Sequence, residues 1–371
     1  MERDTARERR LRVLREVASI PTAPFHEARV GRYVTRFLAG LGLAPRRDQW
    51  GNLIACYSRG DDGRVPLALV AHMDHPAFEI TVAEKGKAIG TLLGGVSAAC
   101  FDKPVAVRVF RTATGDEVGG EIVGHEVPEP RQVSLRLTLD AAVAPGDFGV
   151  FDLPDYEQDG DLIHLRAADD LVGCAATLLA LDELTRRQVK ATVYGVFTRA
   201  EEVGLVGATL LAEAGEIPRE AVVVSLEASR ELPSALVGQG PVIRVGDRAR
   251  SFHPDAEAVL LAAGDRLQRA RPNALVQRQL MSGGTCEATA FGLRGYRTTG
   301  VALPLGNYHN VGPGETIAAE YVGAQDFLTA VDLLVAAVEA AGEPTEHLWS
   351  RFAESAARYR HRLAQTAAEF Q

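Results

Sequence analysis

The sequence has few of the features that assign a protein to a class directly. It contains only four cysteines in 371 residues, and none forms a CxxC pair, so we expect reduced thiols rather than a disulfide framework. No segment approaches the run of about 20 apolar residues that a membrane span needs. No long block of Lys and Arg occurs, and the net charge is −9. We therefore expect neither nucleic acid nor a membrane as a partner.

The N-terminus also lacks the apolar stretch of a secretory signal, because it reads MERDTARERR and continues as an amphipathic helix. A cytoplasmic location is the expectation. At 371 residues, of which 46% are hydrophobic, the chain is long enough for two domains or for one large domain with an insertion.

Hydrophobic patterning changes twice along the chain. Helical spacing covers residues 5–20 and 26–43, and the unbroken apolar run 66–71 predicts a buried central strand. Short runs rich in Val, Ile, Leu and Thr then predict an all-β insertion at residues 76–163. Strands and helices alternate afterwards. The pattern predicts an α/β fold, a mixed sheet with helices on both faces, with residues 1–75 and 164–371 forming the main domain.

Polar residues with metal-binding chemistry follow several of these strands. His72 ends the run 66–71, and Asp74 is close enough to orient its imidazole. Asp169 and Asp170 stand at a strand-to-helix junction, where Asp170 could equally cap the helix. Adjacent Glu201 and Glu202 follow another apolar strand and could divide metal binding from proton transfer, although a solvated loop is the simpler alternative.

Two later residues complete the set. Glu227 ends the strand 221–226, and His309 follows the strand 296–302. Because the carboxyl ends of neighbouring strands meet at one edge of an open α/β sheet, we expect these side chains to converge. Histidine and carboxylate ligands without cysteine suit a pair of zinc-like ions, which would polarise a carbonyl and make hydroxide available near neutral pH. Hydrolysis is the expected reaction.

These motifs resemble the tetrahedral, or glutamyl, aminopeptidase family of dinuclear zinc peptidases. The resemblance rests on AHMD at 71–74, ADDLVG at 168–173, EEVGLVGA at 201–208, GQGPVI at 238–243, GGT at 283–285 and the late His309. It covers most of the chain apart from the C-terminal segment.

The resemblance implies a metal-dependent aminopeptidase that acts on short peptides. Its metals would be two divalent ions, zinc with cobalt or manganese as alternatives. The chain would form a homo-oligomer, and the inserted domain 76–163 would serve in assembly and border the substrate entrance. Glu201 would be the general base and Asp74 the orienting residue, and the implied ligands are His72, Asp169 as the bridge, Glu202, Glu227 and His309.

The chain departs from the family pattern at three places. The family usually has Asp where this chain has Glu227. After GGT it usually has Asp-Ala, whereas this chain has Cys286 and Glu287. Before the final histidine it usually has Arg-Tyr and one further residue, whereas this chain has Gly-Asn-Tyr at 306–308.

Two other functions are compatible with the same motifs. A metal-dependent carboxypeptidase or amino-acid deacylase would need a cation for a substrate carboxylate, and the candidates are Arg244, Arg248, Arg294 and Arg297. A catalytically inactive binding or assembly module would keep the fold and lose ligands, whereas all five ligand positions here hold competent side chains.

Overall fold

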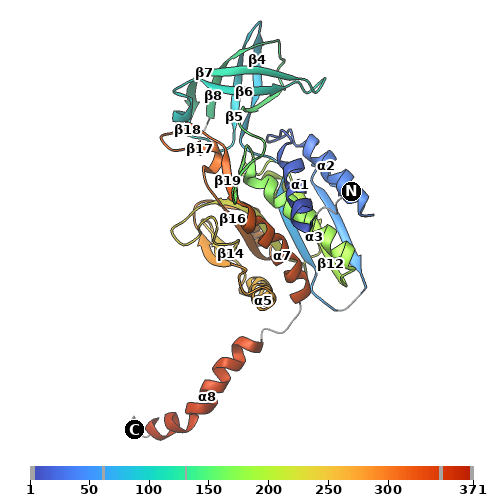
Figure 1. The fold of residues 1–371 in the computed structure, drawn as a ribbon, viewed down its shortest axis with the longest axis vertical. Coiled ribbons are helices and arrows are strands. Elements are labelled where there is room, and N and C mark those ends of the chain that lie inside the picture. Colours follow the sequence, from blue (N-terminus) through green and yellow to red (C-terminus); the bar gives the residue numbers. More distant parts are fainter. Residues whose placement is uncertain (1–4, 61–62, 130–131, 342–345, 368–371) are drawn as a thin grey trace.

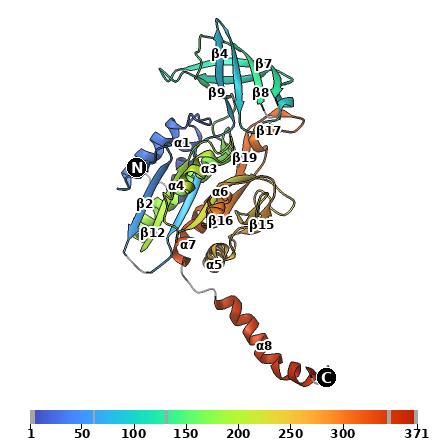
Figure 2. The same ribbon diagram turned by 180° about the vertical axis from the view of Figure 1, so that it is seen from behind.

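The computed structural model describes residues 5–60, 63–129, 132–341 and 346–367. It consists of a mixed sheet flanked by helices, a β-barrel at one end of the molecule and a separate helix at the other (Figures 1 and 2). The predicted α/β fold with an inserted β unit is confirmed.

The main sheet has eight strands, and its four central strands run parallel. The outer strands β2 and β14 are antiparallel to their inner neighbours, β12 and β16. In spatial order the strands are β1 (Arg46–Arg47), β2 (Leu53–Arg59), β12 (Ala191–Thr198), β3 (Leu67–His72), β13 (Val222–Arg230), β16 (Arg297–Leu305), β14 (Val242–Asp247) and β15 (Gln277–Met281).

Helices cover both faces of this sheet. One hydrophobic cluster joins the sheet to α1 (Ala6–Ala18), α2 (Ala28–Gly40), α3 (Ala168–Arg187), α5 (Pro254–Ala270) and α7 (Ala324–Ala340). A second cluster, on the opposite face, contains residues of α4 (Val206–Ala214) and α6 (Glu287–Leu293).

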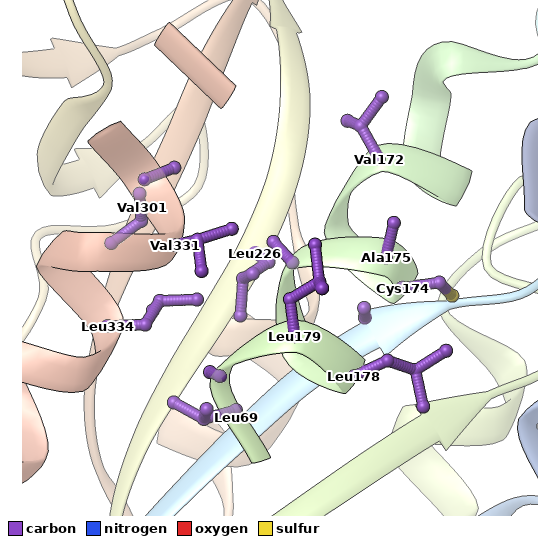
Figure 3. Close-up of a cluster of buried hydrophobic side chains, with 14 of the residues drawn as sticks. Leu69, Val172, Cys174, Ala175, Leu178, Leu179, Leu226, Val301, Val331 and Leu334 are labelled. Carbon is purple, nitrogen blue, oxygen red and sulfur yellow. The ribbon is translucent and has the colours of Figure 1, made fainter. Parts of the chain in front are cut away.

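Strand β3 is buried on both faces, which explains its unbroken apolar sequence. Leu69 and Ala71 belong to the α3 side, whereas Ala68 and Val70 belong to the α4 side. Figure 3 shows Leu69 beneath the α3 helix, where Leu178 and Leu179 also pack. Dense apolar packing of this kind holds the strand ends in fixed positions.

The inserted unit is a closed barrel with the strand order β4-β5-β8-β7-β6-β9. Alternate residues of its strands, such as Ile80, Val107 and Leu135, fill the interior. Its strands are β4 (Ala77–Glu84), β5 (Lys87–Leu93), β6 (Val105–Phe110), β7 (Glu117–Glu129), β8 (Gln132–Leu139) and β9 (Phe148–Phe151), and the 3-10 helix η1 (Ala98–Phe101) follows β5.

Two small sheets lie outside the barrel. Strands β10 (Glu157–Asp159) and β11 (Leu162–Leu165) form one of them with β19 (Glu320–Gly323). The other is a hairpin of β17 (Val311–Gly312) and β18 (Thr316–Ile317), which follows the 3-10 helix η2 (Tyr308–Asn310). The pairing of β11 with β19 brings the start of α3 close to η2.

The last described helix, α8 (Glu346–Ala367), projects from the main domain on the side opposite the barrel (Figures 1 and 2). Among the described residues, no helix combines the length and the apolar character that crossing a membrane requires.

Candidate metal centre

The parallel strands deliver the candidate residues to one edge of the sheet. His72 is the last residue of β3, and Glu227 lies near the end of β13. Glu201 and Glu202 follow β12, and His309 follows β16 in η2. Since these four strands are neighbours and parallel, their carboxyl ends form a single site.

The five sequence-predicted ligands form two groups that share Asp169. In the first group, His72 Nε2 lies 3.4 Å from Asp169 Oδ1 and 3.9 Å from Glu227 Oε2. In the second, His309 Nε2 lies 3.7 Å from Asp169 Oδ2 and 3.2 Å from Glu202 Oε2. The two oxygens of Asp169 therefore face different histidines, as a bridging carboxylate requires.

Both histidines have the ring orientation of a metal ligand. Nδ1 of His72 donates to the backbone carbonyl of Asp74 at 3.2 Å, and Nδ1 of His309 donates to that of Gly95 at 3.0 Å. With the proton on Nδ1, the lone pair of Nε2 faces the carboxylates in each group. Such second partners commonly fix the tautomer of a ligating histidine.

Unpaired buried atoms show that the residues present fit a cation. His72 Nε2, Asp169 Oδ1, Glu202 Oε1 and Glu227 Oε1 are buried and have no hydrogen-bond partner among the described residues. Buried polar atoms are rarely left in this condition, and all four are good zinc ligands. A divalent ion in the first group would engage His72 Nε2 and Asp169 Oδ1.

The electrostatics of the cluster lead to the same conclusion. Burial, reinforced by neighbouring carboxylates such as Asp169, raises the pKa of Glu227 to about 8. Burial and surrounding acids also raise the pKa values of Glu201 and Glu202 well above the ordinary range. Positive charge is therefore needed to keep these groups ionised near neutral pH.

Glu201 lies beside the first group. Its Oε2 is 4.0 Å from His72 Nε2, and His72, Glu201 and Glu202 form a third group that could hold a metal ion. His72 already has Asp169 and Glu227 as partners in its group. Of the adjacent Glu201 and Glu202, Glu201 is the acid that the two groups sharing Asp169 do not require, and this position suits proton transfer.

The Asp74 carboxylate holds the loop that carries both glutamates. Its two oxygens accept the backbone N–H groups of Glu201, at 3.0 Å, and Glu202, at 3.1 Å. Its Oδ1 is 3.7 Å from His72 Nδ1, which is ion-pair distance but not a hydrogen bond. The sequence suggested an effect of Asp74 on His72 alone, and the structure adds this contact with the glutamate loop.

Glu320 is a buried residue of the site that no sequence pattern indicated. Its carboxylate accepts the backbone N–H groups of Ala168 at 2.8 Å, Asp169 at 3.0 Å and His309 at 2.8 Å. One side chain therefore fixes the bridging aspartate relative to the histidine of the second group. Because β19 is short and Glu320 has no neighbouring acid or histidine, only the fold could reveal this role.

We expect Glu320→Gln to weaken metal binding and activity by about 10- to 100-fold, the usual effect of losing a group that orients ligands. The amide nitrogen of Gln would face backbone N–H donors and break at least one of the three hydrogen bonds. Competition with a chromophoric chelator, together with kcat/KM, measures the effect.

Asp326→Asn is the matched control for this substitution. Asp326 is a buried carboxylate that accepts the N–H groups of Gly238 and Gly240, both at 2.7 Å, but holds no candidate ligand. The Asp326→Asn variant should have lower thermal stability and unchanged metal affinity. Equal losses of metal affinity in the two variants would show that Glu320 has only a general structural role.

His75 forms a second link that the sequence did not reveal. It is buried, and its Nδ1 lies 2.5 Å from the backbone oxygen of Asp169. Its Nε2 lies 2.9 Å from Asn310 Oδ1, and Asn310 in turn donates to the carbonyl of Arg166 at 2.8 Å. The segments around Asp169 and His309 are thus joined on two sides.

The remaining acids near the centre each have a partner for one carboxylate oxygen, whereas Asp170 Oδ2 and Glu287 Oε2 have none among the described residues. Asp170 Oδ1 accepts the N–H of Gly173 at 3.1 Å, which is the helix-capping role left open by the sequence. Glu287 is buried and accepts the hydroxyl of Thr198. Burial raises the pKa of Glu287 to about 7. The preceding Cys286 is buried and free.

A pocket adjoins the first group of ligands. Glu227, Arg230, Arg244, Gly283, Gly284 and Tyr308 line it, among other residues. Arg244 is buried, and within the described part of the chain its side chain makes one hydrogen bond, of 3.3 Å to Ser229 Oγ, while its Nε has no partner there. Arg294 pairs with Glu213 at the surface, and Arg297 donates to the exposed carbonyl of Glu220. Among the four arginines considered from the sequence, only Arg244 lines this pocket.

A family model described as M42 glutamyl aminopeptidase matches residues 135–320. A putative aminopeptidase of Acetivibrio thermocellus is 27% identical over 311 residues, which cover 78% of this chain and 87% of that protein. The putative aminopeptidase FrvX of Escherichia coli is 25% identical over 228 residues, or 54% of this chain and 62% of that protein.

Solved structures have the same fold. An aminopeptidase of the archaeon Desulfurococcus kamchatkensis superposes with a TM-score of 0.76 at 24% identity, over 91% of this chain and 96% of that one. The TET1 peptidase of Pyrococcus horikoshii, which can assemble into a tetrahedron or a large octahedral shell, gives a TM-score of 0.73 at 23% identity, over 89% and 99%.

Proposed function

Since this chain belongs to the M42 glutamyl aminopeptidase family and is a metal-dependent aminopeptidase, we propose that it removes N-terminal residues from short peptides at a centre of two divalent ions. The observation that carries this proposal is the position of Asp169 between His72 and His309. The first ion would be held by His72, Asp169 and Glu227, and the second by Asp169, Glu202 and His309. Zinc suits these ligands, with cobalt or manganese as alternatives.

Two divalent ions at these positions would polarise the scissile carbonyl and lower the pKa of a bound water molecule to about 7. Glu201 would accept the proton of the attacking water and later pass it to the leaving amine. Asp74 would keep Glu201 in reach by holding the N–H groups of Glu201 and Glu202. Burial of the site would exclude bulk water and strengthen each of these contacts.

The remaining assignments concern the whole chain. Residues 76–163 would form the assembly and entrance domain, and residues 1–75 and 164–371 the catalytic domain. The similarity to the TET1 peptidase, which can assemble into a tetrahedron or a large octahedral shell, supports a homo-oligomer. A cytoplasmic location is compatible with four cysteines that are free in the structure.

A free substrate N-terminus should be required for cleavage. The acids around the two groups can pair with a substrate ammonium, which a carboxylate-binding site would repel. Acetylating the amine of a short peptide should abolish cleavage, whereas amidating its C-terminus should be tolerated. Chromatography of the products from the free, acetylated and amidated forms of one peptide tests this directly.

Rapid cleavage of the acetylated peptide, with none of the amidated form, would favour the carboxypeptidase or deacylase alternative and give Arg244 the substrate C-terminus. No cleavage of any form by metal-loaded protein would favour the inactive assembly module.

The pocket beside Glu227 also supports a preference for an acidic first residue. Arg244 is a buried cation with unused donors, and such a group is stabilised by an anion. Arg230, which lies over the Tyr308 ring, adds a second positive charge to the pocket lining. A substrate side-chain carboxylate would supply the missing partner of Arg244.

Arg244→Met should therefore lower kcat/KM for an N-terminal Glu substrate by about 10- to 100-fold, the usual range for losing a charged hydrogen-bonded pair. Activity on an N-terminal Leu substrate should change little. Parallel assays of glutamyl and leucyl amides measure this ratio. Equal losses on both substrates would instead assign Arg244 to support of Glu227.

A further inference from the structure

The glutamate loop is held by side chains from other parts of the chain. Each backbone N–H group of residues 199–202 donates to a side-chain oxygen. Asp74 accepts the last two, as described above. Asn52, which precedes β2, accepts the first at 3.0 Å, and Glu27, which precedes α2, accepts the second at 2.9 Å. Residues far away in the sequence therefore set the position of this loop.

Glu27 joins the loop to the N-terminal segment through one buried carboxylate. Its Oε1 accepts the N–H groups of Phe25 and Ala200, both at 2.9 Å. Its Oε2 accepts Nε of Arg199 at 2.7 Å, and the same guanidinium donates to the carbonyls of Trp50 and Phe25. Only 1% of Glu27 is exposed, so water competes little for these hydrogen bonds.

A general structural role does not account for an acid at this position. An acid at the start of a helix commonly caps it, whereas the Glu27 side chain makes no capping hydrogen bond to α2, all of which the structure describes. Burial, followed by the charge of Asp74, raises the pKa of Glu27. A buried ion pair such as that of Glu27 with Arg199 adds little stability compared with apolar residues of similar volume.

Ala200 has a backbone conformation that depends on its contacts. Its φ is +53°, in the left-handed region that alanine rarely adopts, and the residue is buried. Residues in this conformation persist where the surrounding structure fixes them, and they cluster at functional sites. Glu27 accepts the N–H of Ala200, and the next residue is Glu201. This hydrogen bond therefore holds the backbone turn from which the Glu201 side chain extends.

The two glutamates of the loop differ in what else would hold them. An ion in the second group would anchor Glu202 through its side chain. The groups that share Asp169 do not require Glu201, so its position depends on the backbone of the loop. We propose that Glu27 is a positioning residue for Glu201, which fixes the direction from which this base reaches the attacking water. This role rests on the proposed function, in which Glu201 is the base.

Glu27→Gln tests this role with little change of shape. The amide nitrogen would face either the two backbone N–H groups or the guanidinium of Arg199, so at least one contact is lost. We expect kcat for a leucyl amide to fall by about tenfold, with KM within about twofold of wild type. Glu27→Leu removes every contact of the carboxylate and should lower kcat by about 100-fold. Both variants should retain about two ions per chain by elemental analysis.

A double-mutant cycle with Glu201→Gln separates positioning from general support of the site. Once the base is absent, Glu27 has no base to position. Glu27→Gln should therefore change kcat by less than about twofold in the Glu201→Gln background. Glu257→Gln is the matched control, because Glu257 is also a buried acid paired with an arginine, Arg278, but lies in α5. It should leave kcat unchanged in both backgrounds.

Several results would overturn this role for Glu27. Additive losses of kcat in the double mutant, or loss of an ion from a folded Glu27→Gln protein, would show that Glu27 supports the site as a whole. Normal kcat in Glu27→Gln beside an active wild type would remove the role and leave the proposed function intact. Metal-loaded wild-type protein without activity would remove both. Circular dichroism checks each fold, and Glu27→Gln decides the question if Glu27→Leu does not fold.

Discussion

Glu201→Gln should reduce kcat by about 10² to 10⁴, the usual contribution of general acid–base catalysis, while the protein keeps its fold and its metal. Gln has nearly the shape of Glu but cannot accept a proton from water. The two candidate metal-binding groups that share Asp169 do not require Glu201, and Asp74 accepts the backbone N–H of Glu201, which the substitution leaves in place. Steady-state kinetics and elemental analysis of the same preparation separate catalysis from binding.

The matched comparison is Glu202→Gln, at the neighbouring position. Glu202 Oε2 lies 3.2 Å from His309 Nε2, so this variant should lose metal as well as activity. Glu157→Gln, on an exposed strand, should change neither. Loss of one ion from Glu201→Gln would identify Glu201 as a ligand, and near-normal turnover would exclude it as the base.

Removal of metal should abolish activity almost completely, because every chemical step in the proposed reaction depends on charge that the protein itself does not supply. Four of the candidate ligands each have a buried atom with no hydrogen-bond partner in the described part of the chain. Exhaustive chelation should therefore leave a folded but inactive chain, and adding zinc, cobalt or manganese should restore turnover. The loaded protein should contain about two ions per chain.

Circular dichroism of the chelated protein provides the control, since it distinguishes loss of metal from loss of fold. His309→Ala should lower the metal content to about one ion per chain, because the first group remains complete. Unchanged activity after exhaustive chelation would contradict the metal mechanism. A single ion in the wild-type protein would contradict the bridging role of Asp169.

Strand periodicity made the main features predictable. The apolar run 66–71 corresponds to β3, and the strand predicted at 221–226 corresponds to the first part of β13. Each of these strands ends where polar residues begin. Because the carboxyl ends of neighbouring parallel strands meet at one edge of the sheet, the predicted strand ends also predicted that His72 and Glu227 lie close together. The strand predicted at 296–302 was too short, since β16 continues to Leu305 through an apolar segment that includes Pro304.

Other elements left no usable pattern in the sequence. Strands β14 and β15 were not predicted, because GPVIRVGD and QRQLM are short and mixed in polarity. Glu320 and His75 act through backbone groups of segments far away in the sequence, so their spacing to the ligands carries no signal. Long-range contacts of this kind depend on how the strands are connected rather than on local propensity.

The contact between Gly95 and His309 limits how far the barrel can be exchanged independently of the main domain. Gly95 lies in the connection that leaves β5 of the barrel, and its carbonyl holds Nδ1 of a candidate metal ligand. A Cβ atom at this position would lie 3.1 Å from that nitrogen, so the backbone approaches the ring closely. The barrel is therefore not an exchangeable module. A chimaera that transplanted it from a relative would carry part of the candidate metal centre with it, and sequence change in this connection should be constrained together with change around His309.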